Sequence, residues 1–140
     1  VAAATPEQVA AFRERWNLRG PVIGMAARLA AEKGVEVLLR ALPRVLEVHP
    51  EARVLFAGPF EHVLGEEAYA RRLAPEFARF ARNWSFLGTL GAAEMGAFFP
   101  NLDVLVVPSL NSTETFGLVQ VEAMLCGTPS IAAALPGVRQ

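Results

Sequence analysis

Two glutamates, Glu114 and Glu122, lie eight positions apart where a short apolar run gives way to a helical pattern. A carboxylate accepts hydrogen bonds through both of its oxygens, which suits the paired hydroxyls of a sugar. Near the start of a helix, Glu122 could hold both hydroxyls of a ribose. Glu114 could reach a hexose or the positive charge that develops on it. The same spacing is common where one glutamate caps a turn and the other is solvated, so the pair alone decides nothing.

Two cations, Arg28 and Lys33, follow an earlier apolar run, and Gly34 comes directly before another helical pattern. A helix N-terminus carries partial positive charge, so a lysine there becomes favourable when an anion binds the free N–H groups. An arginine adds a forked, charge-assisted grip on phosphate oxygens. This pair of cations favours a diphosphate as the ligand. The alternative is a solvated loop in which Glu32 neutralises Lys33.

The backbone at Phe116, Gly117 and Leu118 could complete such a site. We expect the helix that carries Glu122 to begin there, and the first amides of a helix have no partner inside it. Those amides would point into the same cleft as Lys33. Gly117 also removes a side chain where a ligand has to approach the backbone.

Five short apolar runs have the length of buried strands. They are Pro21–Ala26, Arg53–Ala57, Trp84–Leu87, Asp103–Val107 and Pro129–Ala132. Between them lie longer stretches whose apolar residues recur at the spacing of a helix face. The expected helices are Thr5–Trp16, Val35–Leu46, Tyr69–Phe80, Glu94–Phe99 and Leu118–Leu125. The first of these helices begins with a threonine N-cap followed by proline, which is a typical helix start.

This alternation predicts an α/β fold, a three-layer α/β/α Rossmann-like domain with a parallel sheet and right-handed crossovers. We expect one such domain across residues 1–140. In open parallel sheets, ligands bind beyond the carboxyl ends of the strands. The loop with Arg28 and Lys33 and the loop with Glu114 both follow strands, so the fold would bring them to one edge.

The composition of the chain limits the classes of partner that can be expected. Hydrophobic residues make up 53% of the chain and charged residues 19%, which fits a folded domain. The 13 basic and 14 acidic residues nearly cancel, so no nucleic-acid partner is expected. The single cysteine, Cys126, excludes an internal disulfide and is compatible with a reducing cytoplasm. No apolar run approaches the ~20 residues that span a bilayer. We therefore expect a cytoplasmic protein, and we expect the chain from Val1 to Gln140 to be part of a longer one.

Motifs of several enzyme classes are missing from the sequence. It contains no Walker loop, Gly-x-Gly-x-x-Gly fingerprint, nucleophile elbow or His-Glu-x-x-His. Their absence argues against an NTPase, a nicotinamide dehydrogenase, a serine hydrolase and a zinc protease. His49 and His62 have no ligand spacing to a cysteine or carboxylate cluster, so no metal site is expected.

The segment Ser109–Gly127 resembles the Glu-x7-Glu motif of retaining glycosyltransferases of family 4, which have the two-domain GT-B architecture. The loop Arg28–Gly34 resembles the diphosphate-binding loop of that family. The runs Phe86–Gly88 and Asp103–Ser109 match its strands, and the resemblance extends from about Pro21 to the end of the chain. It departs from the pattern at Ala27, where the family usually has glycine, and in an abbreviated glycine loop after the second strand.

The resemblance implies that the chain is the C-terminal, donor-binding half of such an enzyme. Arg28 and Lys33 would bind the donor diphosphate and take part in catalysis, and Glu122 would bind the ribose. The donor would be a UDP-, GDP- or ADP-sugar, with no metal and no further cofactor. The acceptor, unknown from this sequence, would be held by an N-terminal domain of the full-length protein.

The resemblance also assigns the sugar and the base. Glu114, as a third catalytic residue, would hold the transferred hexose together with the amides of Phe116, Gly117 and Leu118. Backbone groups of Leu87 and Gly88 would meet the nucleobase.

Two other functions stay open at this stage. One is a stand-alone module that binds a nucleotide or pairs with another subunit, and the other is a GT-B sugar-nucleotide epimerase. The isolated domain should in any case transfer nothing, because catalysis in this architecture requires two domains to close. Whether the parent protein contacts a membrane peripherally is equally open.

Overall fold

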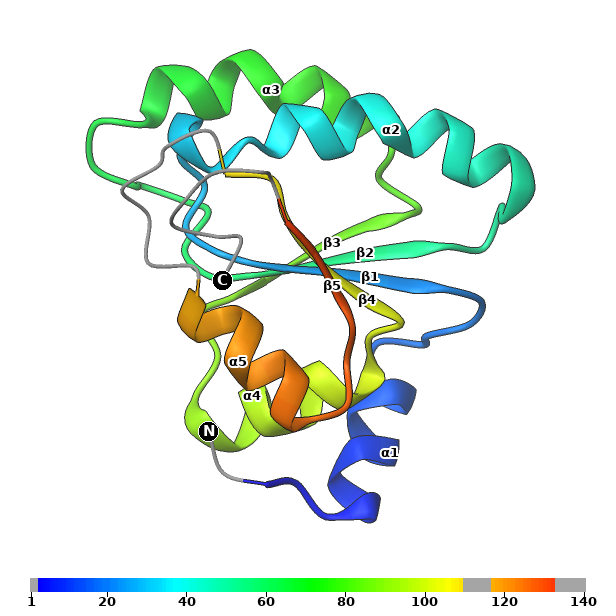
Figure 1. Ribbon diagram of the computed structural model, residues 1–140. Coiled ribbons are helices and arrows are strands. Elements are labelled where there is room, and N and C mark those ends of the chain that lie inside the picture. The colour runs from blue at the N-terminus through cyan, green and yellow to red at the C-terminus, as the bar shows by residue number, and fades with distance from the viewer. Residues whose placement is uncertain (1–2, 110–116, 133–140) are drawn as a thin grey trace.

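One parallel sheet runs through the centre of the computed structural model, which describes residues 3–109 and 117–132 (Figure 1). Its strands lie in the order β3-β2-β1-β4-β5. They are β1 (Val22–Ala26), β2 (Arg53–Ala57), β3 (Trp84–Gly88), β4 (Val104–Val107) and β5 (Ser130–Ala132). All four strand pairings are parallel. Each predicted strand is present, and its ends agree with the prediction to within one residue.

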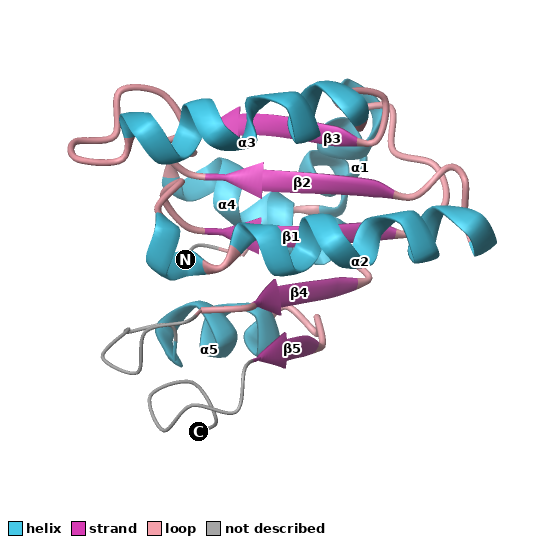
Figure 2. Ribbon diagram, turned by 90° about the horizontal axis from the view of Figure 1, so that it is seen from above, coloured by secondary structure: helices cyan, strands magenta, loops and turns pink. Residues whose placement is uncertain are grey.

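Helices cover both faces of the sheet, which confirms the predicted three-layer α/β/α fold (Figure 2). The helices α2 and α3 lie on one face, and α1, α4 and α5 lie on the other (Figure 1). They are α1 (Pro6–Arg15), α2 (Val35–Val48), α3 (Glu67–Arg79), α4 (Ala92–Phe98) and α5 (Gly117–Leu125). Two short 3-10 helices, η1 (Ala31–Lys33) and η2 (Phe99–Asn101), precede α2 and β4.

The lead-in helix α1 begins as its sequence predicts. The Thr5 hydroxyl accepts a hydrogen bond from the Gln8 N–H at 3.1 Å, and the Gln8 side chain accepts one from the Thr5 N–H at 2.9 Å. Pro6 occupies the first helical position, where its missing N–H costs nothing. A reciprocal cap of this kind stabilises a helix by about 1 kcal/mol.

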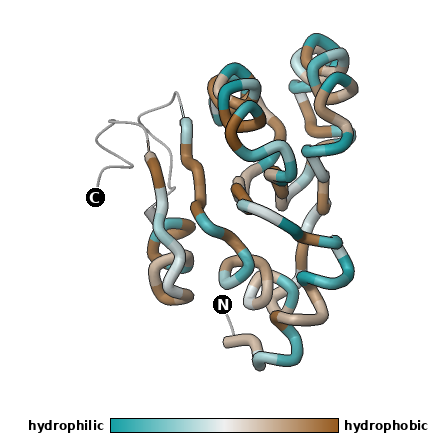
Figure 3. The backbone as a smooth tube through the Cα atoms, turned by 90° about the vertical axis from the view of Figure 1, so that its right-hand side faces the viewer, coloured by the Kyte–Doolittle hydropathy of each residue, from teal (hydrophilic) through white to brown (hydrophobic). Residues whose placement is uncertain are grey.

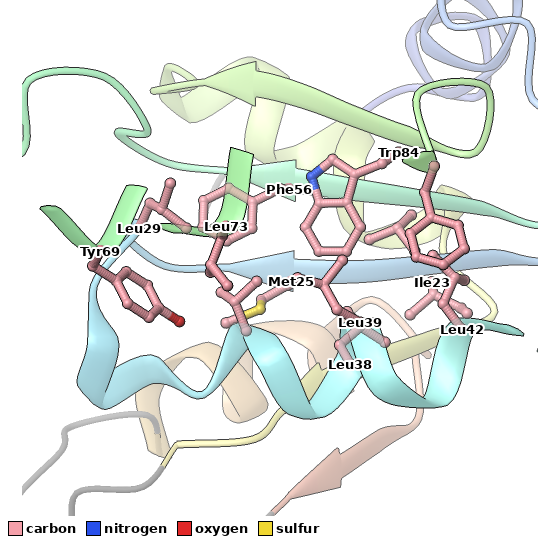
Figure 4. Close-up of a cluster of buried hydrophobic side chains, with 13 residues drawn as sticks. Ile23, Met25, Leu29, Leu38, Leu39, Leu42, Phe56, Tyr69, Leu73 and Trp84 are labelled. Carbon is pink, nitrogen blue, oxygen red and sulfur yellow. The ribbon is translucent and has the colours of Figure 1, made fainter. Parts of the chain in front are cut away.

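The central strands β1 and β2 are apolar and buried on both faces because helices cover both of them, as expected for parallel strands, whereas Ile131 of the edge strand β5 is exposed. On one face, Ile23 and Met25 of β1 pack with α2, α3 and the aromatic rings of Phe56 and Trp84 (Figure 4). On the other face, Val22 of β1 packs with α1 and α4. Brown apolar segments occur in the strands in Figure 3, and the helices carry both brown and teal segments, as expected for helices with one buried face.

The centre of the sheet is also the point where the strand order reverses. β1 pairs with β2 on one side and with β4 on the other. The crossover through α2 leads to β2, whereas the crossover through α4 returns from β3 to β4 on the opposite face. In open α/β sheets, ligands bind at the carboxyl ends of the two strands beside such a reversal.

The helix α5, which precedes β5, is largely exposed. Leu118, Met124 and Leu125 are largely exposed, and Ala123 is the only α5 residue that is buried among those whose burial is described. Within residues 3–109 and 117–132, no helix combines the length and the apolar character that crossing a membrane would require.

Candidate functional site

Arg28 lies two residues beyond β1, on a backbone that is fastened to the end of β2. The Ala27 N–H donates to the Ala57 carbonyl at 2.9 Å, and the Leu29 N–H donates to the Pro59 carbonyl at 2.8 Å. Between these two anchors, the Arg28 side chain is 46% exposed. The structure therefore presents Arg28 to solvent at the predicted edge of the sheet.

Gly58 makes this close approach of β1 and β2 possible. Its φ is +137°, and a Cβ added there would overlap the carbonyl oxygen of Ala27. Its N–H donates to the Gly88 carbonyl at 2.8 Å. The abbreviated glycine turn noted in the sequence thus ties together the carboxyl ends of the first three strands.

Lys33 ends η1 and stands directly before α2. Its side chain is only 10% exposed. Gly34 follows with a φ of 73°, and no side chain caps the N-terminus of α2. The helix dipole disfavours a largely buried cation at such a helix start, whereas an anion bound there would be favoured.

One carboxylate lies between the two predicted phosphate ligands. Oε1 of Glu32 is 2.7 Å from the Arg28 NH2 group and 4.0 Å from Nζ of Lys33. The alternative in which Glu32 simply neutralises Lys33 is therefore incomplete, because its shorter contact is with Arg28. The structure brings Arg28 and Lys33 within 4.0 Å of the same Glu32 oxygen.

Two residues that the sequence analysis missed hold the η1 turn in place. A carboxylate oxygen of Glu66, from the loop after β2, accepts a hydrogen bond from the Ala31 N–H at 3.3 Å. The fully buried Ser109, from the loop after β4, donates to the Glu32 carbonyl at 3.3 Å. The loops on either side of the strand reversal are thereby linked. The position of Ser109 directly after an apolar run was a usable signal, but nothing marks Glu66.

The first turn of α2 also carries a carboxylate, Glu36, that has partners on α3. Glu36, in the first helical turn, accepts a hydrogen bond from the Tyr69 hydroxyl at 2.7 Å and pairs with Arg72 at 3.3 Å. Burial, followed by the Glu36 carboxylate, raises the pKa of Tyr69 well above its usual range. The hydroxyl therefore stays protonated and keeps Glu36 directed toward α3.

The predicted base-binding residues lie at the end of β3. Gly88 has a φ of 72°, and its carbonyl is already used by Gly58. Leu87 is half-buried against the α4 side of the sheet. Phe60 stacks on Phe86 on the other side, with ring centroids 4.5 Å apart. The carboxyl end of β3 therefore presents a partly apolar, well-packed surface beside the ends of β1 and β2.

The second predicted loop is only partly described. Gly117 begins α5, as predicted, and Glu122 lies in the same helix with a half-buried side chain. Leu118 is 70% exposed. Glu114 and Phe116 lie outside the described residues, so the proposed sugar contacts stay predictions. Within the described ranges, no group of three or more His, Cys, Asp or Glu side chains is arranged to hold a metal ion.

These features define a Rossmann-like α/β domain with a candidate anion site at its strand reversal. Residues 7–140 match the family model described as Glycosyl transferases group 1. The chain therefore belongs to the glycosyl transferases group 1 family, and its fold is that of the Rossmann-like domains of the GT-B architecture.

Relatives and solved structures agree with this assignment. The D-inositol 3-phosphate glycosyltransferase of Stackebrandtia nassauensis is 36% identical over an alignment of 141 positions, covering 96% of this chain and 31% of that protein. The GDP-mannose-dependent monoacylated alpha-(1-6)-phosphatidylinositol monomannoside mannosyltransferase of Corynebacterium glutamicum is 32% identical, covering 96% of this chain and 35% of that protein. The crystal structure of Anabaena HepE in complex with UDP superimposes with a TM-score of 0.79 at 29% identity, covering 96% of this chain and 36% of HepE. The chain thus spans about a third of the length of these proteins.

Proposed function

We propose that this chain is the donor-binding, C-terminal domain of a retaining glycosyltransferase that transfers a hexose from a nucleoside diphosphate sugar. Family membership supports the transferase class. The observation that carries the donor site is the single Glu32 oxygen that lies within 4.0 Å of both Arg28 and Lys33. A diphosphate oxygen in the same place would hydrogen-bond to Arg28 and lie within ion-pair distance of Lys33. It would also lie beside the start of α2, where no side chain caps the helix.

The two cations would act on the leaving group. In the proposed reaction, the bond between the anomeric carbon of the hexose and the diphosphate oxygen breaks, and the diphosphate leaves with the electron pair. Arg28 and Lys33 would offset the negative charge that grows on it, the kind of electrostatic stabilisation that usually contributes most to catalysis. No metal would then be needed for this role. The acceptor hydroxyl would pass its proton to the departing diphosphate as its oxygen bonds to the anomeric carbon with retention of configuration.

The rest of the donor would extend along the same edge of the sheet. Glu122 would accept hydrogen bonds from the ribose hydroxyls. Glu114 and the amides of Phe116, Gly117 and Leu118 would hold the hexose, as the family resemblance implies. The base would lie against the end of β3, next to Leu87 and Gly88.

The rest of the enzyme would lie in a longer protein. We propose an N-terminal domain that holds the acceptor and closes over the donor, as loop and domain closure does in many transferases. The isolated chain should then bind the donor nucleotide and transfer nothing. We also place the protein in the cytoplasm, which the single thiol of Cys126 permits.

Calorimetric titration of this chain with UDP, GDP and ADP in the absence of metal tests the proposal. HepE binds UDP and UDP-glucose, whereas the C. glutamicum relative is named for GDP-mannose, so the base has to be measured. We expect one nucleotide to bind, and Lys33→Ala and Glu122→Ala each to weaken it about tenfold or more. Arg44→Ala, an exposed change farther along α2, is the matched control and should bind like the parent chain. Unchanged binding in both site variants would contradict the placement of the donor.

A further inference from the structure

The Glu32 carboxylate occupies the position that the proposed donor phosphate requires. It contacts the Arg28 guanidinium at 2.7 Å and approaches the Lys33 ammonium to 4.0 Å. Both cations belong to the same short loop, so an anion bound between them has to compete with this carboxylate. The donor and Glu32 cannot hold the same N–H groups of Arg28 at once.

The main chain and the side chain of Glu32 are held very differently. Its carbonyl accepts the hydrogen bond of the buried Ser109, and the preceding Ala31 N–H is held by Glu66. Its side chain, in contrast, is 31% exposed. The carboxylate can therefore turn toward water without moving the backbone that carries Lys33.

The exchange is favourable once a diphosphate arrives. A partly exposed carboxylate–guanidinium pair contributes little net stability, because water competes for both partners. A diphosphate brings more negative charge and several more acceptor oxygens to the same two cations. In the empty site, however, the Glu32 carboxylate offsets the repulsion between Arg28 and Lys33.

We propose that Glu32 is an internal counter-anion: it holds the diphosphate position while the site is empty and is displaced when the donor binds. This inference rests on the proposed donor site and adds a residue that sets donor affinity. Its presence stabilises the empty domain and weakens donor binding. Removing its charge should have the two opposite effects.

Glu32→Gln tests this inference because it keeps the size of the side chain and removes its charge. We expect UDP, or whichever of the three nucleotides binds, to bind about fivefold more tightly in metal-free calorimetry. The thermal midpoint of the empty chain should fall, and the increase caused by the nucleotide should grow. Glu47→Gln, an exposed charge at the far end of α2, is the matched control and should change neither quantity. Glu32→Ala gives a second variant with the same expected direction.

Lys33 offers a direct readout, because it is the only lysine in the sequence. Reductive methylation with a carbon-13 label gives it one NMR signal, separate from that of the N-terminal amine. We expect the Lys33 signals of the parent chain and of Glu32→Gln to differ in the empty state. They should nearly coincide when nucleotide is bound, because the carboxylate has then left Lys33 in the parent chain.

The outcomes separate this inference from the proposed function. Tighter binding together with coinciding bound-state signals supports the displacement of Glu32. Equal or weaker binding by Glu32→Gln, with Lys33→Ala still weakening binding, overturns the inference and leaves the donor site standing. Failure of the parent chain and of Glu32→Gln to bind any of the three nucleotides overturns both.

Discussion

Cations gather at both edges of the sheet, but they are held in opposite ways. At the amino edge, the Arg53 guanidinium donates to the Trp16 carbonyl at 3.0 Å, just after α1 ends, and to the Ser85 hydroxyl at 2.6 Å. At the carboxyl edge, Arg28 and Lys33 lie around the Glu32 carboxylate instead. The first arrangement uses neutral acceptors, a backbone carbonyl and a hydroxyl, and the second uses a negative charge.

The direction of the helices explains the difference. In a parallel α/β sheet, the crossover helices end at the amino edge and begin at the carboxyl edge. A helix end offers carbonyl oxygens, which accept hydrogen bonds from a cation, whereas a helix start offers only N–H groups. The two terminal nitrogens of the Arg53 guanidinium therefore find neutral acceptors at this edge, although its buried Nε has no hydrogen-bond partner. The carboxyl-edge cations require an anion, either Glu32 or a ligand.

The most damaging change is expected at Gly58, which connects the strand ends of the carboxyl edge. Gly58→Ala places a methyl group against the Ala27 carbonyl at a φ that L-residues rarely adopt. We expect the free energy of unfolding to fall by about 3 kcal/mol or more, measured by urea denaturation. A loss below ~1 kcal/mol would show that β1 and β2 can separate at this edge. Arg28 would then not be held on a fixed backbone, and the comparison of the two edges would fail.

Next in size is the loss of the amino-edge cation. Arg53→Leu removes the bonds to the Trp16 carbonyl and the Ser85 hydroxyl and leaves both without this donor. We expect about 2 kcal/mol of destabilisation in urea, because half-buried polar groups lose their partners. Nucleotide affinity measured by calorimetry should stay at the parental value. A parallel loss of affinity would mean that the two edges are coupled.

Arg28→Gln should show the reverse pattern. The Arg28 side chain is 46% exposed and its ion pair is solvated, so the free energy of unfolding should change by less than ~0.5 kcal/mol. Nucleotide binding should weaken about tenfold, since a charge-assisted contact with phosphate is lost. Urea denaturation and calorimetry on the same preparation check both numbers. A large stability loss with intact binding would reverse the roles assigned to the two edges.

The smallest expected effect is that of salt. Nucleotide binding at the carboxyl edge should weaken about threefold on raising ionic strength severalfold, because screening acts on partly exposed charges. The destabilisation caused by Arg53→Leu should be independent of salt, since it comes from lost hydrogen bonds to neutral groups. Calorimetry and urea denaturation at low and high chloride concentration compare the two responses directly.

Local patterns in the sequence were sufficient to predict the strands and helices. Short apolar runs predicted the ends of each strand to within one residue. For the central strands β1 and β2 the reason is that a strand buried on both faces needs a continuous apolar segment. Thr5 and Pro6 marked the start of α1 in the same way. The rule that ligands bind at carboxyl ends then brought Arg28 and Lys33 to one edge.

Local sequence patterns could not predict the contacts between segments that are distant in the sequence. Glu66 reaches Ala31 across 35 positions, and Ser109 reaches Glu32 across 77, so both contacts depend on strand order and register. Glu32 was visible beside Lys33 in the sequence. Its closer contact with Arg28 depends on how the η1 turn folds the loop back, which spacing alone does not specify.

The exposure of α5 has a consequence for native-state hydrogen exchange. With Ala123 as its only buried residue among those described, α5 has little apolar contact to lose when it opens, unlike α2 with its row of buried leucines. Its amide hydrogens should therefore exchange through local opening, far below the free energy of global unfolding. A nucleotide that binds both Glu122 and Lys33 would make this local opening less frequent. Slower exchange in α5 would then report occupancy of the site from a helix that the empty domain holds only loosely.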